Sequence, residues 1–271
     1  MIEEFESYCK DELSRFKKSS SKDFFESLKY SFFSGGKRAR PQLLLSMGKE
    51  FGLKQKTLYP AAFAIELVHT YSLIHDDLPA MDDDTYRRGK LTHHAKYGEA
   101  SAVLAGDGLL TFAFQILAER YTGDTLKRLV LMLSKSSGAF GMIGGQVLDC
   151  LTDNRDEEIF RKIHLLKTGM LFGFCIAAPG IIAEESPSRV DSLEELGHEI
   201  GLLFQLQDDL FDEDKKDERL EENILAVLSR DGLLSLIEEK KYKVLSLLSE
   251  FGVSTNSSFY GIIKFLFERK Y

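Results

Sequence analysis

The densest group of side chains that could do chemistry lies in residues 75–84, which read HDDLPAMDDD. Five aspartates occur there within nine residues, directly after an apolar stretch. Acidic loops are common on protein surfaces, where water alone solvates them. Carboxylates that are forced together nevertheless raise one another's pKa unless a cation neutralises them. The segment is therefore a candidate cation site.

A second acidic group lies much later, in residues 204–212 (FQLQDDLFD). Asp208 and Asp212 are four residues apart, so on a helix they share one face. The preceding residues 199–207 (EIGLLFQLQ) are mostly apolar, which predicts a buried helix. Uncompensated carboxylates at the end of a buried helix would be costly, so a bound cation is again indicated.

Clusters made only of carboxylates select hard cations, and Mg²⁺ fits them better than Zn²⁺, which prefers histidine or cysteine. Neither cluster has the spacing of an EF-hand. Magnesium held by a few carboxylates usually completes its shell with water and with phosphate oxygens of a substrate. The acidic groups therefore predict a phosphorylated substrate.

Basic residues that could bind such a substrate occur in separate segments. Residues 34–41 (SGGKRARP) combine two glycines, which allow close backbone approach, with three cations, but they do not form a Walker loop. Arg87 and Arg88 follow the first acidic group, and an arginine fork suits phosphate oxygens, although surface salt bridges are the alternative. Lys167 interrupts an apolar helix. His69 lies seven residues before Asp76, about 10 Å along one helix face at 1.5 Å per residue, or else it is a core residue.

Apolar residues recur at spacings of three and four in residues 60–77 and 157–176, which predicts helices there. Residues 101–118 are apolar nearly all round, which predicts a helix buried in the middle of a large bundle. Pro60 is expected in the first turn of its helix, and Pro79 predicts that this helix ends near Asp77. We expect one all-α domain of about ten helices, given the usual helix length.

Composition narrows the functional classes. The chain has 271 residues, of which 44% are hydrophobic and 29% charged, as in a soluble protein with a sizeable core. The net charge of −8 argues against nucleic-acid binding. Three scattered cysteines, Cys9, Cys150 and Cys175, indicate reduced thiols and a cytoplasmic protein. No stretch approaches about 20 uninterrupted apolar residues and the N-terminus lacks signal-peptide features, so we expect no membrane span.

Together these segments resemble the trans-prenyl diphosphate synthase family, and in particular its short-chain bacterial members that make farnesyl diphosphate. The resemblance covers residues 30–212 closely. It implies an all-α bundle around a deep central cavity, formed by one domain over residues 1–271, and usually a homodimer. The family motifs occur in the expected order: GGKRARP at 35–41, IELVHTYSLIHDDLPAMDDDTYRRGKLTHHAKYGEA at 65–100, LAGDGLL at 104–110, GMIGGQVLD at 141–149, KTG at 167–169 and FQLQDDLFD at 204–212.

The resemblance also implies roles for individual residues. Magnesium, with Mn²⁺ as the alternative, would be held by two aspartate motifs that face each other across the cavity mouth: Asp76, Asp77 and Asp82 in the first, and Asp208, Asp209 and Asp212 in the second. The metal binds the allylic diphosphate, whose other ligands would be Arg87, Lys167, Thr168 and Gln205. For Gln205, a buried structural amide is the alternative. Isopentenyl diphosphate would bind to Lys37, Arg40, His69 and Arg88. The residues expected to carry catalysis are Asp76, Asp77, Asp82, Arg87, Lys167 and Asp208.

The implied reaction joins isopentenyl diphosphate head-to-tail to dimethylallyl or geranyl diphosphate. Tyr71 lies five residues before Asp76, about 7.5 Å deeper along a helix, where its ring would block a growing chain. In the family, an aromatic there together with a two-residue insertion such as Pro79-Ala80 accompanies a fifteen-carbon product. We therefore expect farnesyl diphosphate, with geranylgeranyl diphosphate as the alternative and Tyr71 as a core residue in that case.

One segment departs from the family pattern. After the second motif the family commonly has a glycine–lysine loop and a further lysine, whereas residues 213–222 (EDKKDERLEE) contain no glycine and Glu222 occupies the position of that lysine. Either Lys215 or Lys216 replaces it, or the contact is absent. The end of the chain, Arg269-Lys270-Tyr271, resembles a basic tail of the family. The rivals are a non-catalytic subunit of a heteromeric synthase, which tends to lose the aspartates, and a terpene cyclase, which normally lacks the second motif and the 35–41 loop.

Overall fold

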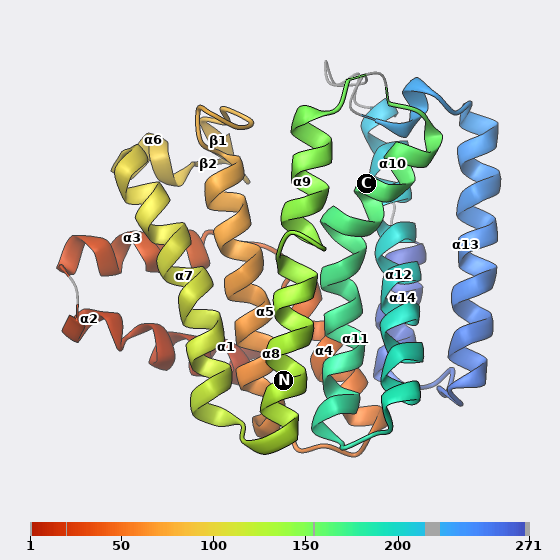
Figure 1. The fold of residues 1–271 in the computed structure, drawn as a ribbon, viewed down its shortest axis with the longest axis horizontal. Helices are drawn as coiled ribbons and strands as arrows, with labels where there is room; N and C mark the ends of the chain where they lie inside the picture. Colours follow the sequence, from red (N-terminus) through yellow and green to blue (C-terminus); the bar gives the residue numbers. More distant parts are fainter. Residues whose placement is uncertain (1, 20, 154, 215–222, 269–271) are drawn as a thin grey trace. The chain divides into compact units, whose positions relative to one another are not determined.

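The computed structural model describes residues 2–19, 21–153, 155–214 and 223–268, without the side chains of residues 18, 19 and 212–214. Almost every element in these residues is a helix, so the predicted all-α class is confirmed (Figure 1). The chain divides into two compact units, Met1–Leu45 with Lys54–Val130, and Ser46–Leu53 with Leu131–Tyr271. That residues 1–271 form a single domain stays a prediction.

The first unit is built from helices and one short hairpin. Two of the boundaries between the units fall inside α4 (Ala39–Glu50) and α8 (Gly123–Ser137), and the third lies between Leu53 and Lys54, just before α5. The other elements of this unit are α1 (Ile2–Leu13), α2 (Phe16–Ser19), α3 (Lys22–Phe32), α5 (Gln55–Asp76), β1 (Tyr86–Arg87), β2 (Lys90–Leu91), α6 (His93–Tyr97) and α7 (Glu99–Arg120).

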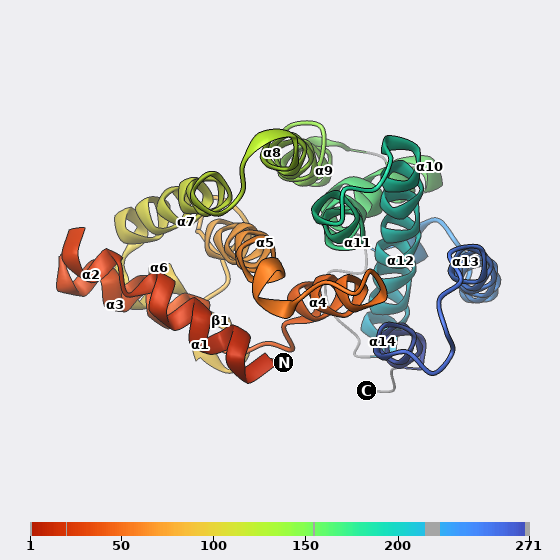
Figure 2. The same ribbon diagram turned by 90° about the horizontal axis from the view of Figure 1, so that it is seen from below.

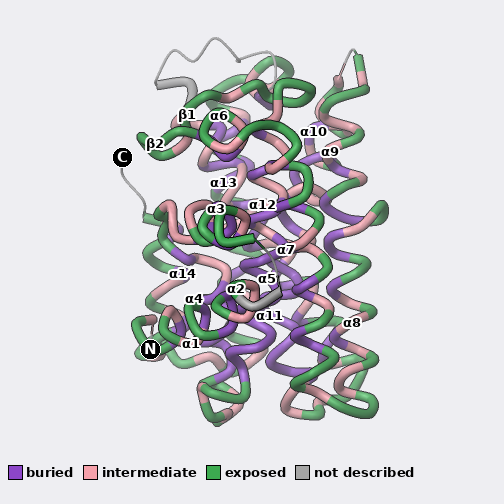
Figure 3. The backbone as a smooth tube through the Cα atoms, turned by 90° about the vertical axis from the view of Figure 1, so that its left-hand side faces the viewer, coloured by how far each residue is buried: buried purple, intermediate pink, exposed green. Residues whose placement is uncertain are grey.

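Helices α5 and α7 lie side by side in the first unit (Figure 2). Their close approach requires a residue without a side chain, because a Cβ atom at Gly106 would lie 2.0 Å from Nε2 of His75. The same Nε2 is 3.1 Å from the carbonyl oxygen of Val103. Further along the pair, the ring of Phe63 packs edge-on against Phe112 at 5.9 Å. Buried residues, purple in Figure 3, run along most of α5.

The second unit is helical throughout its described residues. Its elements are α9 (Met142–Leu151), α10 (Glu157–Ile163), the π-helix η1 (His164–Gly169), α11 (Met170–Ile182), α12 (Pro187–Asp214), the 3₁₀-helix η3 (Ile224–Ala226), α13 (Arg230–Glu250) and α14 (Ser258–Phe267). Side-chain caps start several of them: Asp156 accepts a hydrogen bond from the backbone N–H of Ile159 at the start of α10 (2.9 Å).

Helix α11 forms the buried centre of the second unit and packs against α12. The two backbones approach closely because glycines face each other: a Cβ atom at Gly197 would lie 2.5 Å from Cα of Gly173. Beside them, an apolar cluster joins α10, α12 and η3 through Phe160, Leu203 and Ile224. The elements that carry Lys167 and Asp208 are therefore fixed to one another by close packing.

Two details of the predicted helices are corrected. Helix α5 ends at Asp76 as Pro79 predicts, but it begins at Gln55, so Pro60 lies inside the helix and not in its first turn. Helix α7 is not buried all round, because Val103 and Leu104 are 43% and 60% exposed. On the opposite side of α7, small residues such as Gly106 allow close packing against α5. The helix is therefore buried on one side only, although apolar residues occur all round it.

Two helical runs of the described chain are long and apolar enough, by length and composition, to cross a membrane: Glu99–Arg120 and Glu157–Ile182. In the structure, 44% and 67% of their most apolar windows are buried inside the protein. Core helices of soluble proteins pass the same test. That the chain has no membrane span stays a prediction.

Candidate active site

The first aspartate motif forms a compact turn at the end of α5. The backbone N–H of Asp82 donates to the carbonyl oxygen of Asp76 (2.8 Å), and the N–H groups of Met81 and Asp83 both donate to Leu78 (2.8 and 3.1 Å). The chain therefore folds back on itself, although Asp76 and Asp82 are six residues apart. Asp76 is half-buried and Asp82 is exposed. This turn brings two of the predicted metal ligands next to each other.

Asp77 has a different environment from its neighbours. It is buried, and its Oδ1 accepts a hydrogen bond from Nε of Arg87 on β1 (2.5 Å). Arg87 also reaches Oδ2 of Asp84 at 3.3 Å. Burial raises the pKa of Asp77, and the Arg87 guanidinium opposes this shift. Asp77 therefore orients Arg87, one of the cations predicted to bind the allylic diphosphate.

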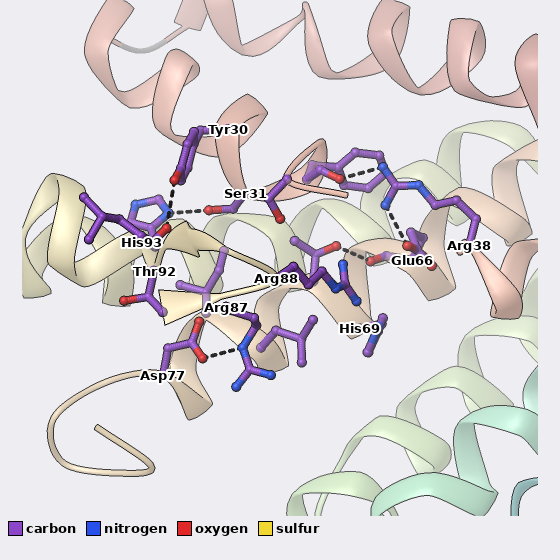
Figure 4. A pocket seen from close by; sticks show the side chains of 16 residues that line it. Tyr30, Ser31, Arg38, Glu66, His69, Asp77, Arg87, Arg88, Thr92 and His93 are labelled. Atoms are coloured by element: carbon purple, nitrogen blue, oxygen red, sulfur yellow. Dashed lines mark hydrogen bonds and ion pairs between the residues drawn. The ribbon is translucent and has the colours of Figure 1, made fainter. Parts of the chain in front are cut away.

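A pocket in the first unit opens beside this ion pair (Figure 4). Helix α5 contributes one stripe of its surface, which includes Glu66, His69 and Asp77, and the hairpin contributes Arg87 and Arg88. Burial and the surrounding arginines, Arg40 and Arg88 foremost, hold the pKa of His69 well below its usual value. His69 is therefore neutral at physiological pH and offers a hydrogen bond without adding a positive charge.

Arg38 anchors the basic loop, residues 34–41, to α5 and to the end of α3. Its Nη1 donates to Oε1 of Glu66 (2.7 Å) and its Nη2 to the carbonyl oxygen of Phe32 (2.6 Å), while the guanidinium lies 4.6 Å from the centre of the Phe32 ring. Both charged side chains are 6% exposed. The backbone of Arg38 has φ 49°, a left-handed conformation that this buried anchor holds in place.

Arg88 of the hairpin also anchors this loop, through the backbone of Gly35. Its Nη1 donates to the carbonyl oxygen of Gly35. A Cβ atom at Gly36 would lie 2.5 Å from the same nitrogen, so glycine is required for this contact. The loop thus keeps Lys37 exposed and Arg40 half-buried near His69. The sequence analysis assigned no role to Arg38 or Glu66. An acidic residue within the apolar stretch IELVH could have indicated a buried ion pair with a basic residue.

The other end of the pocket is neutral and polar. Oγ of Ser31 lies 2.7 Å from Nδ1 of His93, and Nε2 of His93 lies 3.1 Å from Oγ of Ser101. Tyr30 donates its hydroxyl to the carbonyl oxygen of Leu91 (2.8 Å). Burial, and secondarily His94, lower the pKa of His93 to about 4. The pocket therefore carries positive charge at one end only.

Tyr71 lies on α5 one turn before His75, the residue that contacts Val103 of α7. It is buried, its ring packs edge-on against His75 at 5.8 Å, and its hydroxyl has no hydrogen-bond partner among the described residues. Burial, with a contribution from Asp76, raises its pKa to about 12. The ring is therefore buried and held against His75, one turn further along α5.

In the second unit, Lys167 is positioned by an acid that sequence reasoning did not select. Its Nζ donates to Oδ2 of Asp149 on α9 (2.6 Å), and Arg155 donates to the other oxygen (2.9 Å). Helix α9 approaches η1 closely, since a Cβ atom at Gly145 would lie 2.4 Å from the backbone nitrogen of Lys167. Asp149 ends the motif GMIGGQVLD, and its place in that motif was the only signal.

The remaining predicted ligands form one hydrogen-bonded chain. Thr168 donates its hydroxyl to Oε1 of Gln205 (3.1 Å), and Nε2 of Gln205 donates to Oδ1 of Asp209 (3.1 Å). Oδ2 of Asp209 lies 3.2 Å from Nε2 of His164 and accepts from the backbone N–H of Ile224 (3.3 Å). Asp209 is thus buried and engaged within the protein, whereas Asp208 is half-buried.

The residues present fit a hard cation. The Asp76–Asp82 turn offers carboxylate oxygens only, at a position that solvent reaches. Among the side chains that the structure describes, no three from His, Cys, Asp and Glu gather closely enough to hold a metal without further ligands. Asp212 lies outside the described side chains, as do Lys215, Lys216, Glu222 and residues 269–271. That the two aspartate motifs face each other across a cavity stays a prediction.

Comparisons with known proteins identify the family of this chain. The family model "Polyprenyl synthetase" matches residues 21–229. The farnesyl diphosphate synthase of Bacillus subtilis (strain 168) is 40% identical over 230 residues, 81% of this chain and 77% of the relative. A geranylgeranyl diphosphate synthase of Cyanophora paradoxa is 37% identical over 206 residues, 74% and 69% of the two chains.

A solved structure described as an FPP/GFPP synthase from Zymomonas mobilis has a TM-score of 0.83 and 31% identity, and the match covers 98% of this chain and 100% of that one. The chain therefore belongs to the polyprenyl synthetase family, and it has the isoprenoid synthase fold. It is a prenyltransferase, as the resemblance in its motifs implied.

Proposed function

We propose that this chain condenses isopentenyl diphosphate head-to-tail with dimethylallyl or geranyl diphosphate, giving farnesyl diphosphate and free diphosphate. The observation that carries the proposal is the first unit's combination of a carboxylate turn, at Asp76 and Asp82, with an adjoining pocket lined by arginines. The carboxylates of the turn therefore adjoin a group of arginines within one unit. Such a site suits a metal-bound diphosphate beside a second diphosphate held by cations.

Magnesium, or Mn²⁺ as the alternative, would be held by the two aspartate motifs: Asp76, Asp77 and Asp82, with Asp208, Asp209 and Asp212. When bound, the metal supplies Lewis-acid neutralisation of the leaving diphosphate. The exposures support Asp76, Asp82 and Asp208 as the residues that reach it directly. Asp77 and Asp209 would have a second role, because one oxygen of each already binds a side chain of the allylic site, Arg87 and the Gln205 amide respectively.

The allylic diphosphate would be bound by Arg87, Lys167, Thr168 and Gln205. Arginine and lysine stabilise negative charge that develops as the carbon–oxygen bond breaks. Thr168 and Gln205 hydrogen-bond each other in the structure, so both are already aligned side by side. Binding of the substrate would require only a rearrangement of their donors.

Isopentenyl diphosphate would be bound by Lys37, Arg40, His69 and Arg88. Arg38 and Arg88 hold the loop in place before the substrate arrives, which reduces the ordering that binding requires. Fixing the double bond next to the allylic carbon is a proximity effect, which contributes roughly 7–11 kcal/mol in well-oriented reactions. The departing diphosphate is the acceptor for the proton that is lost at the end, so no side chain has to act as the base.

The fifteen-carbon product is proposed because Tyr71 is a buried aromatic residue on α5, five residues before Asp76, where its ring would limit the depth available to a chain. Geranylgeranyl diphosphate is the second candidate, and the similarity to the Cyanophora paradoxa enzyme favours it. The two differ only in where elongation stops. Product length therefore tests Tyr71 separately from the chemistry.

We further propose a soluble cytoplasmic homodimer that uses no nucleic-acid partner. The support for a second copy is the apolar surface on α7, where Val103 and Leu104 are exposed, and on α9, where Ile143 and Val147 are exposed. Exposed apolar side chains on a helix are the kind of surface that a protein partner can cover. A sedimentation measurement of the purified protein decides the oligomeric state.

The function is tested by incubating the purified protein with Mg²⁺, isopentenyl diphosphate and each allylic starter, and by identifying the hydrolysed products by mass. Farnesol from the dimethylallyl and geranyl starters supports the proposal. Geranylgeraniol would retain the chemistry and remove the role of Tyr71. Folded protein that yields no product with any starter would instead indicate a non-catalytic subunit of a heteromeric synthase.

A further inference from the structure

Arg155 shares a carboxylate with a residue of the proposed allylic site. Oδ1 of Asp149 accepts from Nη1 of Arg155 at 2.9 Å, and Oδ2 of the same group accepts from Nζ of Lys167 at 2.6 Å. One carboxylate therefore binds both cations, with one cation on each of its oxygens. The three side chains together carry a net charge of +1, because one acid answers two bases.

The guanidinium of Arg155 is held in a fixed orientation. Its Nε donates to the carbonyl oxygen of Thr152 (3.4 Å), and its Nη2 donates to the carbonyl oxygen of Asp149. The face of the group lies 5.7 Å from the centre of the Phe160 ring. Its side chain is 15% exposed, far less than an arginine on a solvated surface. Ordering of this kind lowers the entropy lost when a ligand binds.

Within the described residues, the hydrogen bonds of this guanidinium also leave some of its donors unused. Arginine carries five N–H groups, of which Nε has one and each terminal nitrogen has two. The contacts to Asp149 and Thr152 use three of them. Asp149 and Lys167 are 22% and 32% exposed, so the group opens toward solvent on the side of Lys167. An anion that reaches Lys167 from solvent thus comes within range of a second, pre-oriented cation.

We infer that Arg155 is a further ligand of the allylic diphosphate and that it acts together with Lys167, while Asp149 holds both cations until the substrate arrives. This inference rests on the proposed function. Diphosphate carries more negative charge than one lysine neutralises, and an arginine fork matches two of its oxygens. The competing reading is that Arg155 only caps the C-terminal end of α9 through the carbonyl groups of Asp149 and Thr152.

The test measures equilibrium binding without turnover. Geranyl diphosphate is titrated into the protein in the presence of Mg²⁺ and absence of isopentenyl diphosphate, and isopentenyl diphosphate is titrated separately. For Arg155→Gln, we expect the Kd of geranyl diphosphate to rise at least about tenfold, the low end of what losing a charge-assisted hydrogen bond costs. The Kd of isopentenyl diphosphate should stay within twofold.

The matched control is Arg161→Gln on the neighbouring helix α10, where Arg161 pairs with Glu157 at 2.6 Å and is 41% exposed. It should leave both Kd values unchanged. Arg155→Lys keeps the charge and loses the fork, so it should bind geranyl diphosphate with an affinity between those of wild type and Arg155→Gln. This second variant also decides the matter if Arg155→Gln does not fold.

The outcomes distinguish a role of Arg155 as a ligand from a role only as a helix cap. A folded Arg155→Gln with a lower melting temperature but an unchanged Kd for geranyl diphosphate overturns the inference and leaves only the cap. An equal rise in both Kd values overturns it too, because the effect would then be general. Wild-type protein that binds no geranyl diphosphate and makes no product overturns the proposed function together with this inference, whereas an active wild type isolates the failure to Arg155.

Discussion

The ion pair between Arg38 and Glu66 offers a quantitative test of how the basic loop is held. Glu66→Gln removes the charge that compensates Arg38 and leaves the shape of the side chain nearly unchanged. Both side chains are 6% exposed, so the pair is buried, and its N–O distance is 2.7 Å. Removing one partner of a buried ion pair costs about 3–5 kcal/mol of unfolding free energy.

The structure indicates the lower end of that range. After the substitution, Arg38 still donates to the carbonyl oxygen of Phe32 and lies 3.5 Å from the half-exposed carboxylate of Glu6. We therefore expect a loss of about 3 kcal/mol, together with a rise in KM for isopentenyl diphosphate that exceeds any rise for the allylic substrate. Denaturant unfolding and steady-state kinetics with each substrate varied in turn measure the two effects.

Two controls make the reasoning refutable. Glu157→Gln breaks an exposed pair, in which Arg161 and Glu157 are 41% and 43% exposed, and should cost no more than about 1 kcal/mol. The double variant Arg38→Met, Glu66→Gln removes the uncompensated charge and should regain part of the stability, but it should not regain the affinity for isopentenyl diphosphate. A Glu66→Gln protein as stable as wild type would refute the account of the loop.

Three further predictions follow from other parts of the structure. Gly145→Ala places a Cβ atom 2.4 Å from the backbone nitrogen of Lys167, so η1 must shift. We expect kcat to fall at least about tenfold, with little change in KM for isopentenyl diphosphate. An unaltered kcat would contradict this prediction. Tyr71→Ala should lengthen the product from fifteen to twenty carbons, measured by mass, and an active variant that still makes only farnesyl diphosphate contradicts the role of the ring. The folded chain keeps His93 neutral, with a pKa of about 4 against 6.5 in the unfolded chain, so only the unfolded chain takes up the proton as the pH falls from 6.5 to 4. His93→Gln should therefore flatten the loss of stability over that range, which reaches about 3 kcal/mol at its acid end, and an unchanged slope would contradict the assignment.

The sequence predicted the helices well because long apolar periodicity and proline are local signals. Pro79 placed the end of α5 at Asp76 within one residue. Pro60 misled the prediction of the start, since tertiary packing around this buried proline tolerates it inside the helix. The exposed face of α7 was also missed, because apolar residues at Val103 and Leu104 do not distinguish a core from a surface that another chain could cover.

The motifs predicted which residues belong to the candidate site, but not which side chains contact one another. Sequence reasoning grouped Asp76 with Asp82 and Thr168 with Gln205, and each pair lies together in the structure. It did not find the Asp149 contact with Lys167, 18 residues away, because a short motif says nothing about which acid meets which base. Nor does an aspartate pair reveal orientation, so the inward-facing Asp209 could not be told from Asp208.

The π-turn at His164–Gly169 sets the rotational phase between α10 and α11. An α-helix advances by 100° per residue and the wider π-turn by less, so the turn absorbs one extra residue and leaves α11 nearly in phase with α10. Gly173 therefore stays on the line where it meets Gly197, in a backbone contact that has no room for a side chain. If the same six residues wound as a regular α-helix, α11 would rotate by about 100° and Gly173 would leave that line, so the wide turn that presents Lys167 and Thr168 and the glycine contact one turn further on depend on each other.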